Sequence, residues 1–413
     1  MKIYIINHYA GTPNHGMVFR PYYLAKEWVN QGHEVTIICA SFSHLRRQNP
    51  CFKEAYEIEW IDGIRYIWLQ TPAYEGNGIG RIINIASFIL RLTLYLNKFC
   101  GESNPDVIIS SSTYHLDIFI TYILARRYNA NFIFEVRDLW PLVPIELGKY
   151  HPLHPFILII SLAEIFGYKK ADRVVSAIPY AYDYMKKRGL DLHRYAYIPN
   201  GVFNKAENCS LDKEVKDKLE SIKKRGRSII GYIGSFRQAY SLESLLLAAK
   251  ELENSGADFV FVGQGDDKKR LERIIKEKNI NNVHIFNPIR KDMIPALLDW
   301  FDICYTGFKK LSCFSYGVSS NKVYDYMLAA KPIVLAVDSP YISLVDHAAC
   351  GITVPAEDTK ALTDALTTFL ASDEKWLKEV GQRGKEYVLK NHDYKKLSRD
   401  YIELIKNIQS NRS

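Results

Sequence analysis

The sequence predicts an α/β protein with two Rossmann-like parallel-sheet domains that face a central cleft. Three observations predict this fold. The 413 residues are more than one hydrophobic core usually organises. Short β-branched runs alternate with helical patterns, and that alternation starts again after residue 226. Because open parallel sheets bind ligands at the carboxyl ends of their strands, two facing sheets predict one ligand shared between the domains.

Twelve short apolar runs carry the strand prediction. In the first half they are KIYIIN (2–7), VTIIC (35–39), RYIWL (65–69), VIIS (107–110), FIFEV (132–136) and RVVSA (173–177). In the second half they are SIIGYIG (228–234), DFVFVG (258–263), VHIF (283–286), ICYTG (303–307), PIVLAV (332–337) and GITV (351–354).

A domain boundary is expected between these two sets of strands. Pro199-Asn200-Gly201 is a turn signal, and the charged segment 205–227 contains no strand-like run. We therefore expect a first domain at residues 1–204 and a second at 205–392. A C-terminal helix at 393–413 is expected to pack back on the first domain.

Composition excludes several classes of protein. With 47% hydrophobic and 24% charged residues, the chain is neither disordered nor a small disulfide framework. The net charge of +8 is short of the clustered basicity of a dedicated nucleic-acid binder, but it suits an anionic ligand or an anionic membrane face. Seven cysteines without a C-x-x-C pair indicate free thiols in a reducing cytosol.

Targeting and membrane signals point to a cytoplasmic protein. The apolar run Ile3 to Ile6 is too short for a secretory signal. The most apolar stretches, 82–90 and 155–163, are interrupted by charges before they reach the roughly 20 residues that span a bilayer. No transmembrane helix is therefore expected.

The segment Arg81 to Phe99 has a helical pattern with only a narrow polar stripe. Such a helix is either enclosed in a core or placed in a membrane interface. Its flanking arginine and lysine residues, together with Tyr95 and Phe99, favour an acidic headgroup region.

Glycines follow several predicted strands. Gly16 follows the first strand and precedes a helical pattern, where a glycine lets amide groups approach an anion, although a single glycine there is often only a turn. In the second domain Gly234 leaves a strand ahead of Arg237 and Gln238, and Arg237 would bring a permanent charge toward a diphosphate. The alternative is that Arg237 is a solvated loop residue that contacts no ligand.

Two further strand ends in the second domain are expected to face a ligand. They carry Gly263 and Gly265 after the second strand, and the segment 286–291, with Ile289, after the third.

A third cluster precedes a predicted helix near residue 322. Ser319, Ser320 and Asn321 come before Lys322, so free amide groups and one ammonium group predict an anion site. Asp325 lies three residues later on the same helix face, where its carboxylate could accept hydrogen bonds from a ribose diol. The alternative is an intrahelical Lys-Asp pair.

In order and spacing, seven motifs resemble the bacterial GT-B glycosyltransferases of family 4 that build O-antigen and capsule sugars. The motifs are HYAGTPNHGMVFRPYYLA (8–25), GHEVTI (32–37), EVRDLWP (135–141), IPNGV (198–202), IGSFRQAYSLESLL (233–246), FVGQG (261–265) and VSSNKVYDYMLAAKPIV (318–334). The resemblance covers nearly the whole chain. It implies transfer from a nucleotide-activated sugar with retention of anomeric configuration and without a catalytic metal, and the sequence has no D-x-D motif.

The resemblance also assigns roles in the second domain. It places the donor phosphates at Lys322 and at Arg237 or Gln238, with further phosphate contacts from the amides of residues 319–321 and ribose contact at Asp325. The sequence departs from the family at four positions. Gly317 stands where the first, sugar-binding Glu of an E-x7-E pattern is usual and Asp325 replaces the second Glu, while Gln238 stands where Lys is usual and Ser241 where Gly is usual.

In the first domain the resemblance implies an acceptor side. Asp138, in the motif after the fifth predicted strand, is the leading catalytic candidate there, while Glu135 could equally belong to a local ion-pair network. His115 lies near the position of an acceptor-binding or proton-relaying His, although a lone His is more often structural.

Together these expectations describe a retaining hexosyl- or N-acetylhexosaminyltransferase that uses no cofactor or metal. Its donor would be a nucleoside-diphosphate sugar, UDP-linked by expectation, and its acceptor a polyprenyl-diphosphate-linked saccharide. It would be a peripheral enzyme on the inner face of the cytoplasmic membrane, with an anionic lipid surface and no nucleic acid as partner. Two alternatives remain from the sequence: a UDP-sugar 2-epimerase and a non-catalytic, membrane-associated assembly protein.

Overall fold

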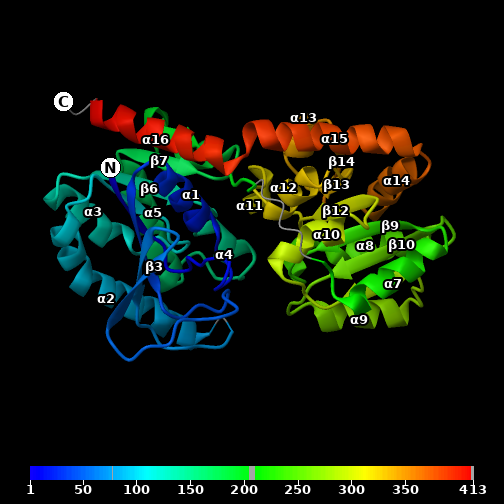
Figure 1. The fold of residues 1–413 in the computed structure, drawn as a ribbon, viewed down its shortest axis with the longest axis horizontal. Helices are drawn as coiled ribbons and strands as arrows, with labels where there is room; N and C mark the ends of the chain where they lie inside the picture. The colour runs from blue at the N-terminus through cyan, green and yellow to red at the C-terminus, as the bar shows by residue number, and fades with distance from the viewer. Residues whose placement is uncertain (77, 204–209, 411–413) are drawn as a thin grey trace. The chain divides into compact units, whose positions relative to one another are not determined.

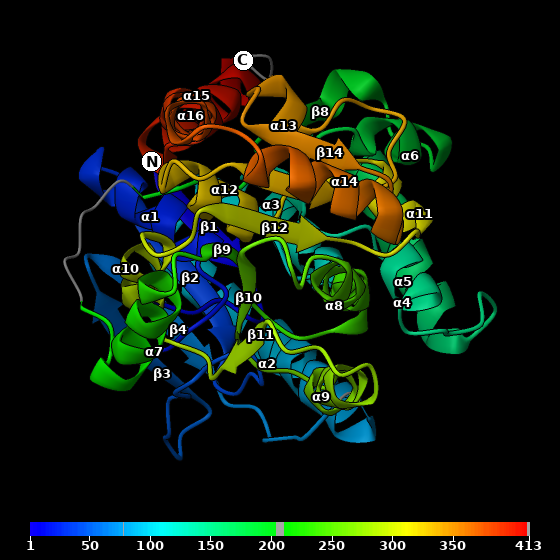
Figure 2. The same cartoon turned by 90° about the vertical axis from the view of Figure 1, so that its right-hand side faces the viewer.

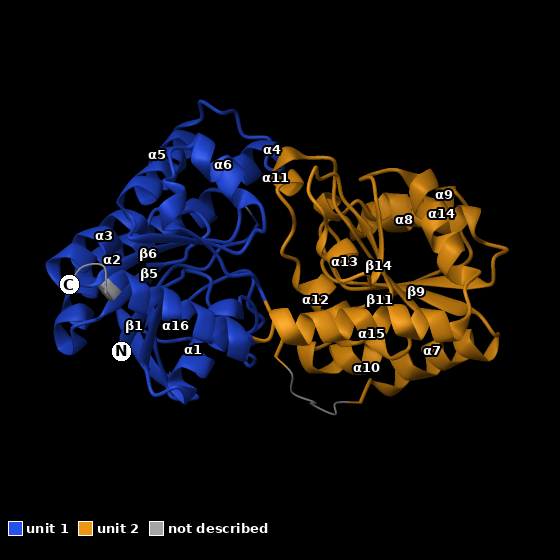
Figure 3. Cartoon of the chain, turned by 90° about the horizontal axis from the view of Figure 1, so that it is seen from above, with its two compact units in different colours: residues 1–200, 394–413 blue, residues 201–393 orange. Residues whose placement is uncertain are grey.

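The computed structural model describes residues 1–76, 78–203 and 210–410 (Figure 1). It divides into two compact units, coloured separately in Figure 3. Unit 1 contains residues 1–200 and the segment that begins at Tyr394, and unit 2 contains residues 201–393. Each unit holds one predominantly parallel sheet, which confirms the predicted fold class of two Rossmann-like domains.

The sheet of unit 1 has the strand order β3-β4-β2-β1-β5-β6-β7-β8. Its strands are β1 (Lys2–Ile6), β2 (Glu34–Ala40), β3 (Tyr56–Ile61), β4 (Ile64–Leu69), β5 (Val107–Ser110), β6 (Asn131–Val136), β7 (Arg173–Ser176) and β8 (Tyr195–Tyr197). All neighbours are parallel except β3, which forms an antiparallel hairpin with β4. The two-residue turn of that hairpin, Asp62-Gly63, has positive φ at both positions, as a type I′ turn requires.

The helices of unit 1 cover both faces of this sheet. They are α1 (Arg20–Asn30), α2 (Ile79–Ser103), α3 (Ile118–Arg127), α4 (Leu142–Glu146), α5 (Pro155–Lys170), α6 (Ala181–Lys187) and α16 (Tyr394–Ser410), with a 3₁₀ turn at Leu192–Arg194. Helix α2 contacts α3, and α3 contacts α5, so these three form one layer (Figure 3).

Helix α16 packs against α1, far from it in sequence. The Trp28 indole donates a hydrogen bond of 3.0 Å to the carbonyl oxygen of Ser398, and its ring meets Tyr401 edge-on at 5.2 Å. Both aromatic side chains are fully buried. The last described helix therefore completes the core of unit 1, the unit on which the sequence analysis expected it to pack.

The sheet of unit 2 has the order β11-β10-β9-β12-β13-β14, and every pairing is parallel. Its strands are β9 (Ser228–Ile233), β10 (Ala257–Val262), β11 (Val283–Phe286), β12 (Ile303–Gly307), β13 (Ile333–Ala336) and β14 (Gly351–Val354). All six coincide with predicted strands. Continuous apolar runs are typical of such strands because both faces of the sheet are covered.

Two hydrophobic cores lie on the two faces of this sheet. Along β9, Ile229 and Ile233 belong to one core, while Ile230 and Tyr232 belong to the other, which is the period of two expected for a strand. Figure 2 shows α8, α9 and α14 on one side of the sheet and α7, α10, α12 and α15 on the other.

The helices of unit 2 are mostly short. They are α7 (Lys213–Lys224), α8 (Leu242–Glu251), α9 (Lys268–Glu277), α10 (Ile294–Leu298), α11 (Ser312–Ser315), α12 (Asn321–Leu328), α13 (Leu344–His347), α14 (Thr359–Leu370) and α15 (Glu374–Asn391), with 3₁₀ turns at Gln238–Tyr240 and Lys291–Met293.

Candidate functional site

The carboxyl ends of β9 and β12 meet at the topological switch point of the second sheet. Strand β9 is followed by β10 on one side, whereas its other neighbour is β12. Connections leave these two strands in opposite directions, and the crevice so formed is the usual ligand position in an open parallel sheet. The residues predicted to contact a donor lie around this point.

Lys322, in the first turn of α12, extends across the end of β9. A Cβ atom on Gly234 would lie 2.2 Å from Cε of Lys322, so the lysine occupies the space that a side chain at 234 would need. Its Nζ atom lies 3.4 Å from the centroid of the Tyr240 ring and 5.3 Å from that of Tyr232. The aromatic rings thus hold the ammonium group at the switch point.

The charges around Lys322 favour an anion. Burial lowers the pKa of Lys322, and the nearby Arg237 guanidinium lowers it further, while Tyr240 and Asp325 oppose the shift. A negatively charged ligand stabilises two cations that lie close together in a partly desolvated position. We therefore expect nucleotide phosphate to restore the ordinary pKa of Lys322.

Asp325 lies one turn further along α12. Burial raises the pKa of this carboxylate, and the positive charges of Lys291 and Lys322 oppose the increase. Lys291, in the 3₁₀ turn after β11, belongs to the segment 286–291 that was expected to face a ligand, although no role was assigned to this lysine. It reaches the site from a separate strand end, so only the tertiary fold brings it to Asp325.

The glycines of this site leave space for close backbone approach. A Cβ on Gly263 would lie 1.9 Å from the carbonyl oxygen of Gly234, and one on Gly265 would lie 2.1 Å from that of Phe236. The amide of Gly234 donates to Val262 and that of Gly263 to Phe286. Their amides are thus used within the sheet, and these glycines act by permitting Lys322 and the strand ends to pack closely.

The other predicted donor residues surround this centre. Arg237 and Gln238 are exposed where the chain enters the 3₁₀ turn before α8. Ser319 bonds through its hydroxyl to Tyr324, and Ser320 and Asn321 begin α12, where the Val323 amide donates a hydrogen bond of 3.1 Å to the carbonyl oxygen of Ser320. Ile289 is partly buried and packs against the core.

Two departures from the family pattern coincide with left-handed backbone. Gly317, at the position of the usual Glu, has φ of 87°, and Ser241, at the position of the usual Gly, has φ of 46°. A glutamate at 317 would be strained in this loop conformation, whereas Ser241 adopts the region that glycine prefers. The left-handed backbone favours glycine at both positions. It therefore explains why residue 317 is a glycine in this chain and why a glycine is usual at position 241 in the family.

In unit 1 the ends of β5 and β6 carry a buried ion pair. Glu135 accepts two hydrogen bonds from the Arg20 guanidinium, at 3.1 and 3.0 Å, and one of 2.6 Å from the Ser111 hydroxyl. Arg20 also donates to the carbonyl oxygen of Ile198 at 2.8 Å. Glu135 therefore belongs to the local network that the sequence analysis gave as the alternative to catalysis.

His115 and Asp138, the predicted acceptor-side residues, lie in different environments. His115 is buried, its Nδ1 atom is 3.0 Å from the carbonyl oxygen of Ser112, and its ring packs edge-on against Phe134. Burial lowers the pKa of His115 to about 4, so the ring is neutral at pH 7. Asp138 is exposed in the loop before α4. Their catalytic roles stay predictions.

Gly16 does not present its amide to a ligand. The amide donates a hydrogen bond of 2.8 Å to Thr12, and α1 begins four residues later at Arg20. The φ of Gly16 is 109°, and a Cβ there would lie 2.8 Å from the backbone nitrogen of Arg47. The turn alternative therefore describes this glycine better than the predicted anion contact.

Two buried residues near the first strand were not predicted. His8 follows β1, and its Nδ1 atom is 2.6 Å from the Tyr114 hydroxyl. Burial lowers the pKa of His8 well below its usual value. Arg46 donates to the carbonyl oxygens of Ala10 and Ala40. The position of His8 just after the first strand could have indicated this cluster from the sequence. No local sequence pattern indicated that Arg46 would join it.

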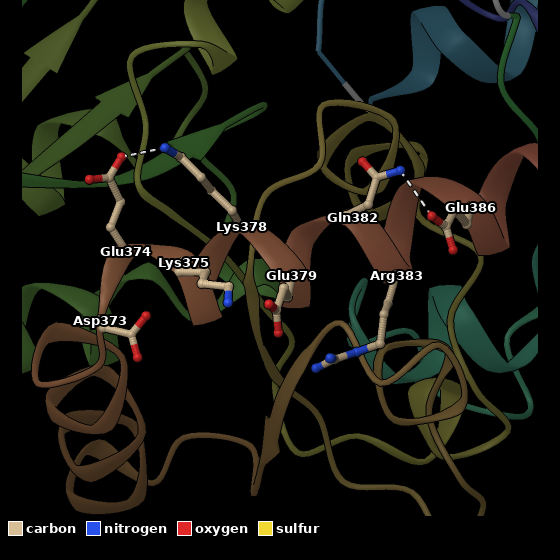
Figure 4. A pocket seen from close by; sticks show the side chains of 8 residues that line it. All are labelled: Asp373, Glu374, Lys375, Lys378, Glu379, Gln382, Arg383 and Glu386. Atoms are coloured by element: carbon tan, nitrogen blue, oxygen red, sulfur yellow. Dashed lines mark hydrogen bonds and ion pairs between the residues drawn. The ribbon is translucent and has the colours of Figure 1, made fainter.

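A hollow on the surface of unit 2 lies away from the strand ends. It is lined entirely by Asp373 and α15, and its charges are partly paired with each other, as Glu374 is with Lys378 (Figure 4). None of the predicted site residues reaches it. Within the described residues, no group of three or more His, Cys, Asp and Glu side chains could hold a metal ion.

Family models match both halves of the chain. The model for a glycosyl transferase 4-like domain matches residues 15–201, and that for glycosyl transferases group 1 matches residues 214–387. The two matches fall in unit 1 and unit 2.

Two relatives match by sequence. A protein described as colanic acid biosynthesis glycosyl transferase WcaI, from Escherichia coli K12, is 34% identical over 286 residues, covering 67% of this chain and 69% of its own. The alpha-D-kanosaminyltransferase of Streptomyces kanamyceticus is 24% identical over 246 residues, covering 56% of this chain. The chain spans 61% of the length of that second relative.

Solved structures share the fold over almost their whole length. Sucrose-phosphate synthase from Thermosynechococcus elongatus superposes with a TM-score of 0.76 at 15% identity, covering 99% of this chain and 100% of its own. HepE from Anabaena, in complex with UDP-glucose, gives 0.69 at 12% identity, with 98% and 100% covered. These likenesses show the fold.

Proposed function

The chain belongs to the bacterial GT-B glycosyltransferases of family 4, and we propose that it moves a hexosyl or N-acetylhexosaminyl group from a UDP-sugar to a lipid-linked saccharide, with retention of anomeric configuration. The proposed process is the synthesis of a bacterial surface polysaccharide such as O-antigen or capsule. The WcaI relative supports this choice because its description assigns it to colanic acid biosynthesis.

One observation carries the donor assignment: Lys322 lies across Gly234 at the switch point of the second sheet. The charge of Arg237 lowers the pKa of Lys322 and that of Lys291 lowers the pKa of Asp325, so three cations contribute positive potential at this site. A nucleoside diphosphate carries negative charge, and helix N-termini bind such groups. The UDP-glucose complex of the HepE neighbour supports UDP as the donor nucleotide.

These residues would act mainly on the leaving group. In the proposed step the bond between the anomeric carbon and the diphosphate oxygen breaks, and the acceptor oxygen bonds to that carbon on the same face. The acceptor proton passes to the departing phosphate. Lys322 and the first-turn amides of α12 stabilise the charge that develops on the diphosphate. Asp325 would accept hydrogen bonds from the ribose diol.

The lipid-linked acceptor is supported by the composition of α2. This helix has 25 residues and, by length and composition, is apolar enough to cross a bilayer, which differs from the expectation that the chain has no such helix. One of its faces packs against the sheet, where Phe88, Leu92 and Leu96 are buried. A helix packed on one side and apolar on the other suits an enzyme that works at the inner face of the cytoplasmic membrane, with Asp138 and His115 as candidate groups on the acceptor side.

The test is the Lys322→Ala variant, assayed with a panel of UDP-sugars and a bacterial lipid extract. We expect kcat/KM to fall roughly a hundredfold or more, as loss of one oxyanion-type contact does. Product anomericity, measured by NMR, tests retention. The matched control is Lys276→Ala, an exposed lysine on α9, which should leave turnover unchanged. Wild-type turnover of Lys322→Ala with the true donor would refute the assignment.

A further inference from the structure

The helix layer α2, α3 and α5 of unit 1 has an apolar outer surface. Of the 18 exposed large hydrophobic side chains among the described residues, ten lie on these three helices. They are Ile79, Ile82, Ile83, Leu90 and Leu94 of α2, Phe119 and Ile123 of α3, and Leu158, Ile159 and Leu162 of α5. Exposed apolar residues concentrated in this way mark an interaction surface.

Most charged groups on these helices are turned inward or placed near helix ends, whereas Lys98 of α2 is exposed and donates to the Tyr56 hydroxyl at 2.8 Å. Glu164 of α5 is fully buried and forms a 2.6 Å ion pair with Arg188. Arg91 of α2 donates to Gln70 at 2.8 Å, and α3 carries no charge before Arg126 in its last turn. Between the helix ends, the outer surface therefore offers few charges to a partner, and the exposed one, Lys98, is a cation.

A basic pocket lies where α3 and α5 end. Its volume is about 360 Å³. Five cationic side chains and one carboxylate are among its lining residues, which gives a formal net charge of +4. The lining residues are Tyr122, Arg126, Lys169, Lys170, Asp172, Arg173, Arg194 and Ile408.

Most of this positive charge is available to a ligand. Lys169 and Lys170 are exposed and form no ion pair with any residue the structure describes. Arg173 and Arg194 donate to backbone carbonyl groups, so their charges are not neutralised by a carboxylate. Asp172 pairs with Arg126 at 3.1 Å and also accepts from the Phe132 amide.

Aromatic contacts join the pocket to the apolar surface. The ring of Tyr122, which lines the pocket, packs against Phe166 at 5.2 Å, and Phe166 contacts Phe119 at 5.0 Å. Arg126 lies over the Tyr122 ring at 5.2 Å. The cations and the apolar residues therefore form one continuous surface.

We propose that this pocket binds the phosphate group of an anionic phospholipid while the outer faces of α2, α3 and α5 enter the acyl boundary of the same leaflet. The proposal rests on the membrane partner of the proposed function and names its contact. A lipid leaflet is the one partner that presents negative phosphate and hydrocarbon side by side over an area of this kind. The pocket lies at the ends of α3 and α5, opposite the strand ends where chemistry is proposed, so it is separate from the acceptor's reacting group.

The test is sedimentation of the full chain with phosphatidylcholine vesicles that contain or lack phosphatidylglycerol. The charge variant is Lys169→Gln/Lys170→Gln, matched by Lys276→Gln/Lys278→Gln at the C-terminal end of α9, where both lysines are exposed in unit 2. Because each cation contributes about 1 kcal/mol at an anionic surface, the first pair should weaken binding to phosphatidylglycerol vesicles roughly thirtyfold and the control pair should not. The apolar variant Ile159→Ser/Leu162→Ser should weaken it as well, with Ile342→Ser as control.

Three results would overturn the proposal. The wild-type chain could fail to bind phosphatidylglycerol vesicles, bind both vesicle types equally, or self-associate through the apolar surface, as seen by light scattering. A gain in melting temperature with inorganic phosphate but no vesicle binding would assign the pocket to free phosphate instead. UDP binding, measured as a melting-temperature shift, should be unchanged in all these variants. If the wild-type chain shows no UDP binding, that result would instead count against the proposed function.

Discussion

Gly234→Ala is expected to disturb Lys322 without touching the lysine itself. The added Cβ would lie 2.2 Å from Lys322 Cε, 3.2 Å from Cδ and 3.3 Å from Nζ. Carbon atoms pack at about 3.5 Å or more, so Cε must move by roughly 1 Å. The movement takes Nζ away from its position 3.4 Å from the Tyr240 ring centroid.

Two costs follow from this displacement. Alanine at the φ of 145° found for Gly234 is strained by about 1 kcal/mol, and loss of the cation-ring contact adds up to about 1 kcal/mol. We therefore expect the free energy of unfolding in urea to fall by about 1–2 kcal/mol, which leaves the protein folded. A misplacement of about 1 Å at a charge-stabilising group is expected to lower kcat/KM roughly a hundredfold.

A double-mutant cycle separates this mechanism from a general loss of stability. If Gly234→Ala acts through Lys322, it should have almost no further effect on kcat/KM in the Lys322→Ala background. Fully multiplicative effects of the two substitutions, or wild-type turnover of Gly234→Ala alone, would refute the reasoning.

Three other substitutions test the described geometry through protein stability. Ser241→Gly should raise the free energy of unfolding in urea by about 1 kcal/mol, because φ is 46° at this position, and a decrease would show that the Ser241–Ser244 hydroxyl contact outweighs the strain. Burial raises the pKa of Asp117 to about 7, so the folded chain holds a proton there that the unfolded chain releases above about pH 4. Stability should then fall as pH rises from about 4 to 7, and Asp117→Asn should flatten that slope and stabilise the protein at pH 8; an unchanged melting-temperature profile would contradict this. Glu135→Gln leaves the buried Arg20 guanidinium without its counter-charge and should cost about 3 kcal/mol or more, whereas a loss below about 1 kcal/mol would show that the pair is dispensable.

Strands with uniform apolar character were predictable, and those with other patterns were not. All six strands of unit 2 coincide with runs read from the sequence, because burial on both faces selects continuous Val, Ile and Phe. Strand β3 was missed because Glu57 and Glu59 alternate with its apolar residues at the exposed edge of the sheet. The Asp62-Gly63 turn that follows it was a hairpin signal in the sequence.

The same limit applies to the site. Lys322, Asp325 and the glycines were predictable because they stand in local patterns at strand ends and a helix start. The segment 286–291 was expected to face a ligand, but a single sequence does not show that its Lys291 acts on Asp325 or that Tyr240 contacts Lys322. The role of the glycines also differs from the prediction. They make room for Lys322 and for each other, and only the packed structure shows those close approaches.

The return of α16 to unit 1 affects the order in which the two units can fold during synthesis. Unit 2 is continuous in the chain, whereas unit 1 needs α16, which is translated after the whole of unit 2. A nascent chain stalled at residue 393 should therefore hold a folded unit 2 but an incomplete unit 1, with Trp28 uncovered and accessible to a chaperone or a protease. Pulse proteolysis of such stalled chains would show protection of unit 2 first and of α1 only after α16 has emerged.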